Sequence, residues 1–191
     1  MKPLAYVEIT PGPDARAHQV FADLHRAVHF GIVEQGPLLA VDYPTAKLSQ
    51  VDELRVIRNG HIGTLMRVFA PDASTLATWL GRNDVLVLRD TDYARISDIR
   101  EAPEGANAVE WKRSRDRDHA FSPSRARREA ARGRAVPRLR LRESVGLALY
   151  SASTRQHMSL QMYCRAVEGA PQLGVPNSYG LSSGSTWLPR F

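Results

Sequence analysis

The sequence predicts an α+β protein in two parts, an N-terminal domain over residues 1–100 and a C-terminal domain over residues 101–191. Three observations lead to this prediction. Strand-like and helix-like segments follow one another as β-α-β-β-α-β in the N-terminal half, basic residues concentrate in one block of the C-terminal half, and two β-rich stretches flank a polar turn after residue 150. The second domain is therefore expected to carry an arginine-rich helix and a β-hairpin.

The first two elements follow from apolar spacing and from turn residues. Residues 4–9 are rich in strand formers and predict a strand that ends at residues 10–13, where two prolines and a glycine lie. Asp14 is expected to cap a helix that continues to about Gln35, because apolar residues recur in it at helical spacing and Gly36 follows.

The same signals predict the remaining elements of the N-terminal part. They are strands over 38–43, 64–70 and 93–99, and a helix that opens at residues 71–74, whereas residues 44–60 are expected to be mostly loop. This order is the ferredoxin-like arrangement of RNA-recognition modules. The aromatic and basic surface motif of those modules is absent, so the fold by itself does not predict RNA binding.

Composition indicates a globular protein. With 191 residues, 43% of them hydrophobic, the chain is long enough for one large or two small domains. Cys164 is the single cysteine, so no internal disulfide can form, and no apolar run approaches the roughly 18 residues that span a bilayer. The first ten residues do not form a signal peptide, and we expect a cytoplasmic protein.

Positive charge is concentrated between Glu110 and Arg142. This segment holds twelve Lys or Arg residues against four acidic ones, a net charge of +8, whereas the whole chain has a net charge of +6. The rest of the chain is therefore slightly acidic. Arginine predominates in the segment, and its guanidinium group binds phosphate oxygens in a bidentate manner. The pattern favours a localised surface for a nucleic acid.

A short helix is predicted inside this segment, over about residues 123–133. Ser122 and Pro123 form a start signal, and Pro137 prevents continuation. Arg125, Arg128 and Arg132 would lie on one face with Arg127 beside them. The alternative is a solvated arginine-rich linker, as charge runs often are. A membrane-surface helix is disfavoured, because the large apolar face that it requires is missing.

Three histidines, His18, His25 and His29, lie along one edge of the apolar stripe of the first predicted helix. His25 is nearest to the buried face, whereas His29 lies further toward solvent and is expected to matter little. A histidine at such an edge can act as a general acid or base, although a hydrogen-bonded boundary histidine is the ordinary alternative. A metal site is disfavoured, because the glutamate of the metalloprotease pattern is missing.

The C-terminal part predicts a strand, a turn rich in hydroxyl groups and a second strand, followed by a Gly/Ser-rich tail. Ser151, Ser153, Thr154 and Gln156 lie in or beside this turn. Composition alone leaves open whether they are ordinary turn residues or part of a site.

Several short motifs together resemble a known family, the CRISPR-associated endoribonucleases of type I-F systems, which process precursor CRISPR RNA. The motifs are Leu24-His25 with Ala27, the turn residues from Ser151 to His157, the segment Ser178-Tyr179-Gly180-Leu181-Ser182, Pro123 with the spaced arginines after it, and Pro189 with Phe191. Their order agrees with the family along nearly the whole chain, except between Asp42 and Gly63.

The resemblance implies cleavage at the base of a repeat hairpin without a metal or another cofactor. By position, His25 matches the catalytic histidine, Ser151 the serine that holds the attacking ribose, and Tyr179 the tyrosine that supports the histidine. The implied partners are the stem-loop of the CRISPR RNA repeat and other subunits of a type I-F surveillance complex. No membrane partner is implied.

The resemblance also implies RNA-binding residues, some of which depart from the family pattern. They are Arg113, Arg115, Arg125, Arg127, Arg128, Arg132, Arg134, Ser153, Thr154, Gln156 and Met158. The departures are Arg115 for a glutamine, Arg134 for a histidine, Met158 for an aromatic residue that stacks on a base, and Glu129 and Gly133 for arginines. The Met158 departure puts that stacking contact in doubt, and the departures on the helix point to a different choice of hairpin.

Two functions remain open from the sequence. The first is a hairpin-specific endoribonuclease in which the 2′-hydroxyl of RNA attacks the adjacent phosphate, so that a histidine and a hydroxyl group suffice. The second is an RNA-binding subunit that holds a guide RNA without cutting it. Only the first requires His25, Ser151 and Tyr179 to lie together.

Overall fold

The computed structural model describes residues 3–36, 38–49, 60–114, 123–134, 143–151 and 156–191. For residues 123–126 and for Ser151 it describes the backbone only. A first sheet contains strands in the order β2-β3-β1-β4, and every neighbouring pair is antiparallel. The strands are β1 (Ala5–Pro11), β2 (Ala40–Asp42), β3 (Met66–Ala70) and β4 (Ala94–Ile96), and a short β5 (Arg100–Glu101) also pairs with β1. Together with the helices this is the predicted ferredoxin-like order.

Three helices belong to this part of the chain. They are α1 (Ala17–Gln35), α2 (Ala73–Leu80) and α3 (Asn83–Asp90). The predicted start of α2 is confirmed, since the Asp72 carboxylate accepts a hydrogen bond from the Thr75 amide at 2.8 Å. The predicted cap of α1 at Asp14 is wrong. The residue before the helix is Arg16, which makes no side-chain cap, because Asp14 lies in the turn that precedes it.

A second sheet follows, with antiparallel strands in the order β7-β8-β6-β9. These are β6 (Asn107–Arg113), β7 (Val145–Ser151), β8 (Gln156–Val167) and β9 (Leu188–Arg190). The predicted hairpin is confirmed as β7 and β8, with Ser151 opposite Gln156 and Val145 opposite Met162. Val145, Leu147 and Leu149 are buried while the residues between them are exposed, so one face of β7 packs on the core.

Helix α1 packs against both sheets. The main core cluster combines Val20, Leu24 and Val28 of α1 with apolar residues of the first sheet, such as Val7, and of the second sheet, such as Leu147. The i, i+4 spacing of the three α1 residues forms the apolar stripe that the sequence predicts. The stripe fixes the rotation of α1 and thereby the direction in which its histidines point.

Buried polar contacts also join the sheets. Asp42, the last residue of β2, is fully buried and accepts hydrogen bonds from Trp111 Nε1 of β6 and from Arg190 Nη2 of β9, both at 2.6 Å. Arginine and indole donors offset the loss of water around the carboxylate. The end of β2, and the residue that follows it, are thus held against the second sheet.

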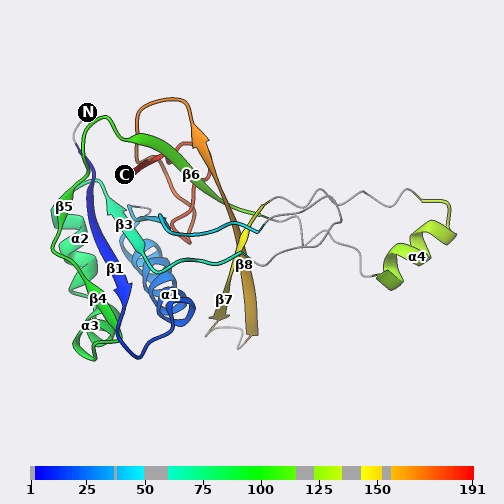
Figure 1. Ribbon diagram of the computed structural model, residues 1–191, viewed down its shortest axis with the longest axis horizontal. Helices are drawn as coiled ribbons and strands as arrows, with labels where there is room; N and C mark the ends of the chain where they lie inside the picture. The colour runs from blue at the N-terminus through cyan, green and yellow to red at the C-terminus, as the bar shows by residue number, and fades with distance from the viewer. Residues whose placement is uncertain (1–2, 37, 50–59, 115–122, 135–142, 152–155) are drawn as a thin grey trace.

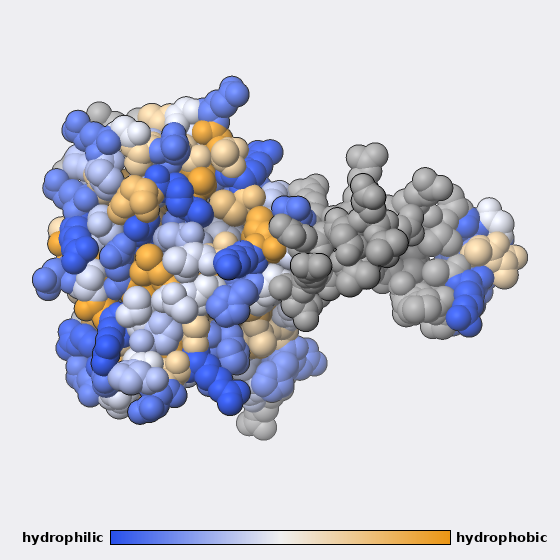
Figure 2. All heavy atoms as spheres, viewed as in Figure 1, coloured by the Kyte–Doolittle hydropathy of each residue, from blue (hydrophilic) through white to orange (hydrophobic). Residues whose placement is uncertain are grey.

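The arginine-rich helix α4 (Pro123–Ala131) lies away from both sheets (Figure 1). The predicted range of this helix, about 123–133, agrees closely with the observed one. Hydrophilic side chains cover much of the visible face of the remaining molecule, and apolar residues are scattered among them (Figure 2). Within the described residues, no helix is both long and apolar enough to cross a membrane.

Candidate functional site

His25 lies at the centre of the candidate site and is fully buried. It follows Leu24 on the core-facing stripe of α1, so helix geometry turns its ring inward. Its Nδ1 lies 2.7 Å from the hydroxyl oxygen of Tyr43. Burial, and secondarily the proximity of His29, lower the pKa of His25 to about 3, against a weaker opposing effect of the Tyr179 backbone. His25 is therefore a neutral imidazole at neutral pH.

Tyr43, which directly follows β2, is a site residue that sequence reasoning missed. Its ring is fully buried between those of Phe21 and Trp111. Burial, with the neighbouring charge of Asp42, raises the pKa of its hydroxyl, so the group stays protonated. An aromatic residue in an apolar strand is an ordinary core residue, and the sequence pattern contains no signal for its contact with His25.

Tyr179 brings the C-terminal segment onto the histidine edge of α1. Its ring stacks on that of His29, with centroids 4.9 Å apart, and lies near that of His25, with centroids 6.1 Å apart. Its hydroxyl lies 3.7 Å from the sulfur of Met158. Gly180, at a φ of +71°, allows the chain to turn there, and a side chain at this position would press on Val28 at 3.1 Å. The expected proximity of Tyr179 to His25 is thus observed.

His29 is held at the rim of this cluster. Its Nδ1 lies 2.7 Å from the carbonyl oxygen of Ser178, the residue before Tyr179. Its side chain is only partly buried, one helical turn beyond His25. The two histidines therefore share Tyr179 as a neighbour but differ in their access to solvent.

The hydroxyl-rich turn is only partly described. Ser151 is the last residue of β7, but its side chain, together with Ser153 and Thr154, lies outside the described residues. Gln156 is exposed at the start of β8, and Met158 is half-buried beneath Tyr179. The roles expected for these residues stay predictions.

Basic side chains line a pocket next to Tyr179. The pocket has a volume of about 330 Å³ and is lined by Lys112, Arg113, Asn177, Ser178, Tyr179, Ser182 and Ser183. Beside it, the buried carboxylate of Glu110 binds Lys112 at 3.0 Å and also pairs with Arg165. Burial acts to raise the pKa of Glu110, but these cations outweigh it and hold the pKa below its usual range. Cations and hydroxyl groups together suit a phosphate.

The arginines of α4 and of the residues just after it form a separate basic surface. Arg127, Arg128, Arg132 and Arg134 are exposed, and Arg125 is a residue of the helix whose side chain is not described. Glu129 pairs with Arg132 at 3.4 Å and with Arg134 at 3.2 Å. Arg115 lies outside the described residues. Of the arginines expected on one face, Arg127 and Arg128 lie on the described part of the helix, whereas Arg132 follows its last residue, Ala131.

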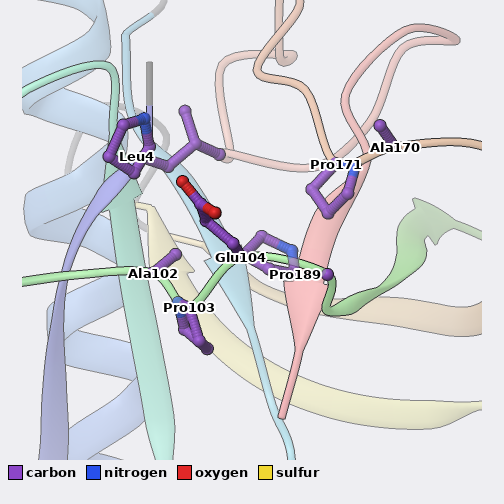
Figure 3. Close-up of a pocket in the computed structure, with 9 residues that line it drawn as sticks. Leu4, Ala102, Pro103, Glu104, Ala170, Pro171 and Pro189 are labelled. Atoms are coloured by element: carbon purple, nitrogen blue, oxygen red, sulfur yellow. The ribbon is translucent and has the colours of Figure 1, made fainter. Parts of the chain in front are cut away.

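A second pocket, of about 340 Å³, is lined mainly by prolines and small residues (Figure 3). Glu104 supplies a carboxylate there, and no Lys or Arg is among the described residues that line it. Its chemistry therefore does not favour a phosphate. Within the described ranges, no group of three or more His, Cys, Asp or Glu side chains is placed to hold a metal ion.

Comparison with known proteins identifies a family. Residues 6–191 match the family model described as CRISPR-associated protein (Cas_Csy4). Among solved structures, one titled "CRISPR associated protein Cas6" is 8% identical, with 100% of both chains covered and a TM-score of 0.37. Another, "Structure A of CRISPR endoribonuclease Cse3 bound to 19 nt RNA", is 14% identical, covering 94% of this chain and 96% of that one, with a TM-score of 0.31. Because both TM-scores are low, these two similarities carry no argument about the function of this chain. No curated protein is significantly similar to the chain.

Proposed function

Because the chain belongs to the Cas_Csy4 family of CRISPR-associated proteins, we propose that it is an endoribonuclease that processes precursor CRISPR RNA. It binds the hairpin of the CRISPR repeat, cuts the RNA at the base of the hairpin and stays bound to the mature guide RNA. The observation that carries this proposal is the position of Tyr179, whose ring joins the histidine edge of α1 to the C-terminal segment. A basic pocket lies beside Tyr179, and a second basic surface, at α4, lies away from it.

Two groups of basic residues would hold the RNA. The exposed arginines of α4 suit the phosphates of a duplex stem, because the deep major groove of A-form RNA hides the base edges from side chains. Lys112 and Arg113 line the pocket beside Tyr179 and suit a phosphate near the cut. Arg115, Ser153, Thr154, Gln156 and Met158 are proposed to complete the RNA contacts, and other subunits of a type I-F complex to assemble on the bound RNA.

The chemistry needs no group beyond those of the protein and the RNA. Removal of a proton from the 2′-hydroxyl lets that oxygen attack the adjacent phosphate in line, and the 5′-oxygen leaves. Ser151 would hold the ribose, His25 would act as the base or as the group that orients it, and Tyr179 would support the histidine. Nearby arginines would stabilise the charge of the transition state.

The test is single-turnover cleavage of labelled repeat RNA in the presence of EDTA. The wild-type protein should cut the RNA at one position, and a 2′-deoxy substitution before the cut should abolish cleavage without weakening binding. His25→Ala should lower the rate by about 10²-fold or more at nearly unchanged affinity. Tight binding of unmodified RNA without any cleavage would instead support a non-catalytic hairpin-binding subunit.

A further inference from the structure

One face of the β7–β8 hairpin points away from the core. Along both strands, buried residues such as Leu147, Leu160 and Met162 alternate with residues whose side chains lie on the opposite face. We call this opposite side the outer face. Its residues are Gly146, Ala148 and Tyr150 on β7 and His157, Ser159, Gln161, Tyr163 and Arg165 on β8.

Aromatic rings lie at two places on the outer face. Tyr150 is directly opposite His157, their ring centroids are 5.1 Å apart, and Tyr150 is 45% exposed. Tyr163, which is half-buried, lies six residues further along β8, or about 20 Å at the usual rise of a strand. Exposed rings on a sheet are a surface on which the bases of unpaired RNA stack, whatever their sequence.

Cations lie at the far end of the same face. Lys112 of β6 is opposite Tyr163, and Glu110 is opposite Arg165. Lys112 and Arg165 both pair with Glu110, which is buried, so the three residues together carry a net charge of +1. Among the described residues of this face, no Asp or Glu is exposed. The charge therefore suits the phosphates of a strand whose bases stack on the rings.

A protein partner fits the outer face less well. Between the two aromatic places the residues are Gly146, Ala148, Ser159 and Gln161, and the Gln161 amide donates a hydrogen bond to the Ser159 hydroxyl at 2.7 Å. This middle part is small and polar, so the face lacks the contiguous apolar patch that marks many protein interfaces. Separated rings joined by a polar surface match a nucleic acid better.

The ring pair lies beside the residue that is proposed to hold the attacking ribose. Tyr150 directly precedes Ser151, and His157 directly follows Gln156, the residue opposite Ser151. The attacking ribose is on the upstream side of the cut, so the downstream strand begins close to this end of the hairpin. Its unpaired bases are then the nearest part of the RNA to the two rings.

We propose that the outer face binds the single-stranded RNA downstream of the cut, with bases stacked on Tyr150 and His157 and phosphates directed toward Lys112 and Arg165. This inference rests on the proposed endoribonuclease function and adds a second RNA site to it. Cleavage separates the downstream strand from the hairpin, so the added contacts hold the precursor and are lost from the product. The protein would thereby distinguish uncut RNA from mature guide RNA.

The test is equilibrium binding of repeat hairpins that carry a 2′-deoxy substitution before the cut and so stay intact. One hairpin ends at the cut, a second continues downstream by about six unpaired nucleotides, and a third has an equal extension upstream. The downstream extension should tighten binding to the wild type by about tenfold or more, and the upstream extension should have little effect. A complementary strand annealed to the downstream extension should remove the gain, because paired bases cannot stack on the rings.

Substitutions assign the gain to the rings. Tyr150→Ala and His157→Ala should each lose most of it while the affinity for the hairpin that ends at the cut stays unchanged. Tyr150→Phe keeps the ring and should keep the gain, as should His18→Ala, a change at an exposed histidine of α1. Unchanged affinity for the shortest hairpin also shows that the variants are folded.

Three results would overturn the inference. They are equal affinity of the wild type for the first two hairpins, a gain that persists in both alanine variants, and a gain from the upstream extension alone. In each case normal cleavage of unmodified repeat RNA would leave the proposed function intact. A wild-type protein that neither binds nor cuts any repeat hairpin would instead refute the proposed function, and this inference with it.

Discussion

Inside the folded protein His25 binds a proton poorly, because burial removes it from water and His29 lies on the next turn of the helix. Its pKa is lowered to about 3, whereas a histidine of an unfolded chain titrates near 6.5. Between these two values the unfolded state binds one proton more at this position than the folded state does. The contribution of His25 to stability is therefore complete above about pH 6.5 and is lost progressively as the pH falls toward 3.

We expect the free energy of unfolding to fall more steeply with decreasing pH in the wild type than in His25→Gln. The difference in slope should approach about 1.4 kcal/mol per pH unit between roughly pH 6 and 4. Urea denaturation at several pH values measures it. His18→Gln, a change at an exposed histidine of the same helix, should keep the wild-type slope. Parallel slopes for wild type and His25→Gln would show that His25 is not buried in its neutral form.

Sequence reasoning predicted part of the cluster formed by His25, His29, Tyr43 and Tyr179. The spacing of α1 placed His25 toward the buried face, and the resemblance brought Tyr179 to it. Tyr43 was missed because its role depends on a contact between β2 and α1 that no local pattern encodes. The hydrogen bond of His29 was missed for a similar reason, since its partner, Ser178, is far away in sequence.

At the scale of secondary-structure elements, α4 and α2 were predictable because their signals are local. Both have clear start signals, Pro123 for α4 and Asp72 for α2. Helix α3 was missed because Gly81 and Arg82 interrupt the apolar spacing before it. Strand β6 was missed because the charged residues Glu110, Lys112 and Arg113 conceal its pattern, although Trp111 and Glu110 are buried.

The basic face of α4 predicts a steep dependence of RNA binding on salt. Each arginine–phosphate contact contributes about 0.7 to 0.9 to the slope of log affinity against log salt concentration. Replacement of Arg125, Arg128 and Arg132 together by Ala should therefore flatten the slope by roughly two to three units. A salt titration of binding measures it, and an unchanged slope would mean that α4 does not face the RNA.

Two controls sharpen this measurement. Replacement of Arg16, Arg89 and Arg95, three exposed arginines of the N-terminal part, by Ala changes the net charge equally and should leave the slope intact. Glu129→Gln acts in the opposite direction, because it frees Arg132 and Arg134 from their shared carboxylate. RNA affinity at low salt should then rise, by an amount limited to a few-fold since exposed ion pairs are weak.

At the scale of the whole molecule, a helical basic arm lies away from a two-sheet body that contains the histidine cluster (Figure 1). A rigid duplex stem can contact both regions at once, whereas a flexible single strand must lose conformational entropy to do so. We therefore expect a repeat hairpin to bind far more tightly than RNA of the same composition with one arm scrambled. Competition binding tests this, and equal affinities would indicate non-specific binding of polyanions.

The identity of the newly formed RNA ends tests the central claim most directly. Attack by the 2′-hydroxyl must leave a 2′,3′-cyclic phosphate on the upstream fragment and a 5′-hydroxyl on the downstream fragment. Mass spectrometry of the two fragments, after wild-type cleavage of repeat RNA, distinguishes these ends from those of hydrolysis by an activated water. We predict the cyclic phosphate and the 5′-hydroxyl, and fragments with a 3′-hydroxyl and a 5′-phosphate would contradict the account.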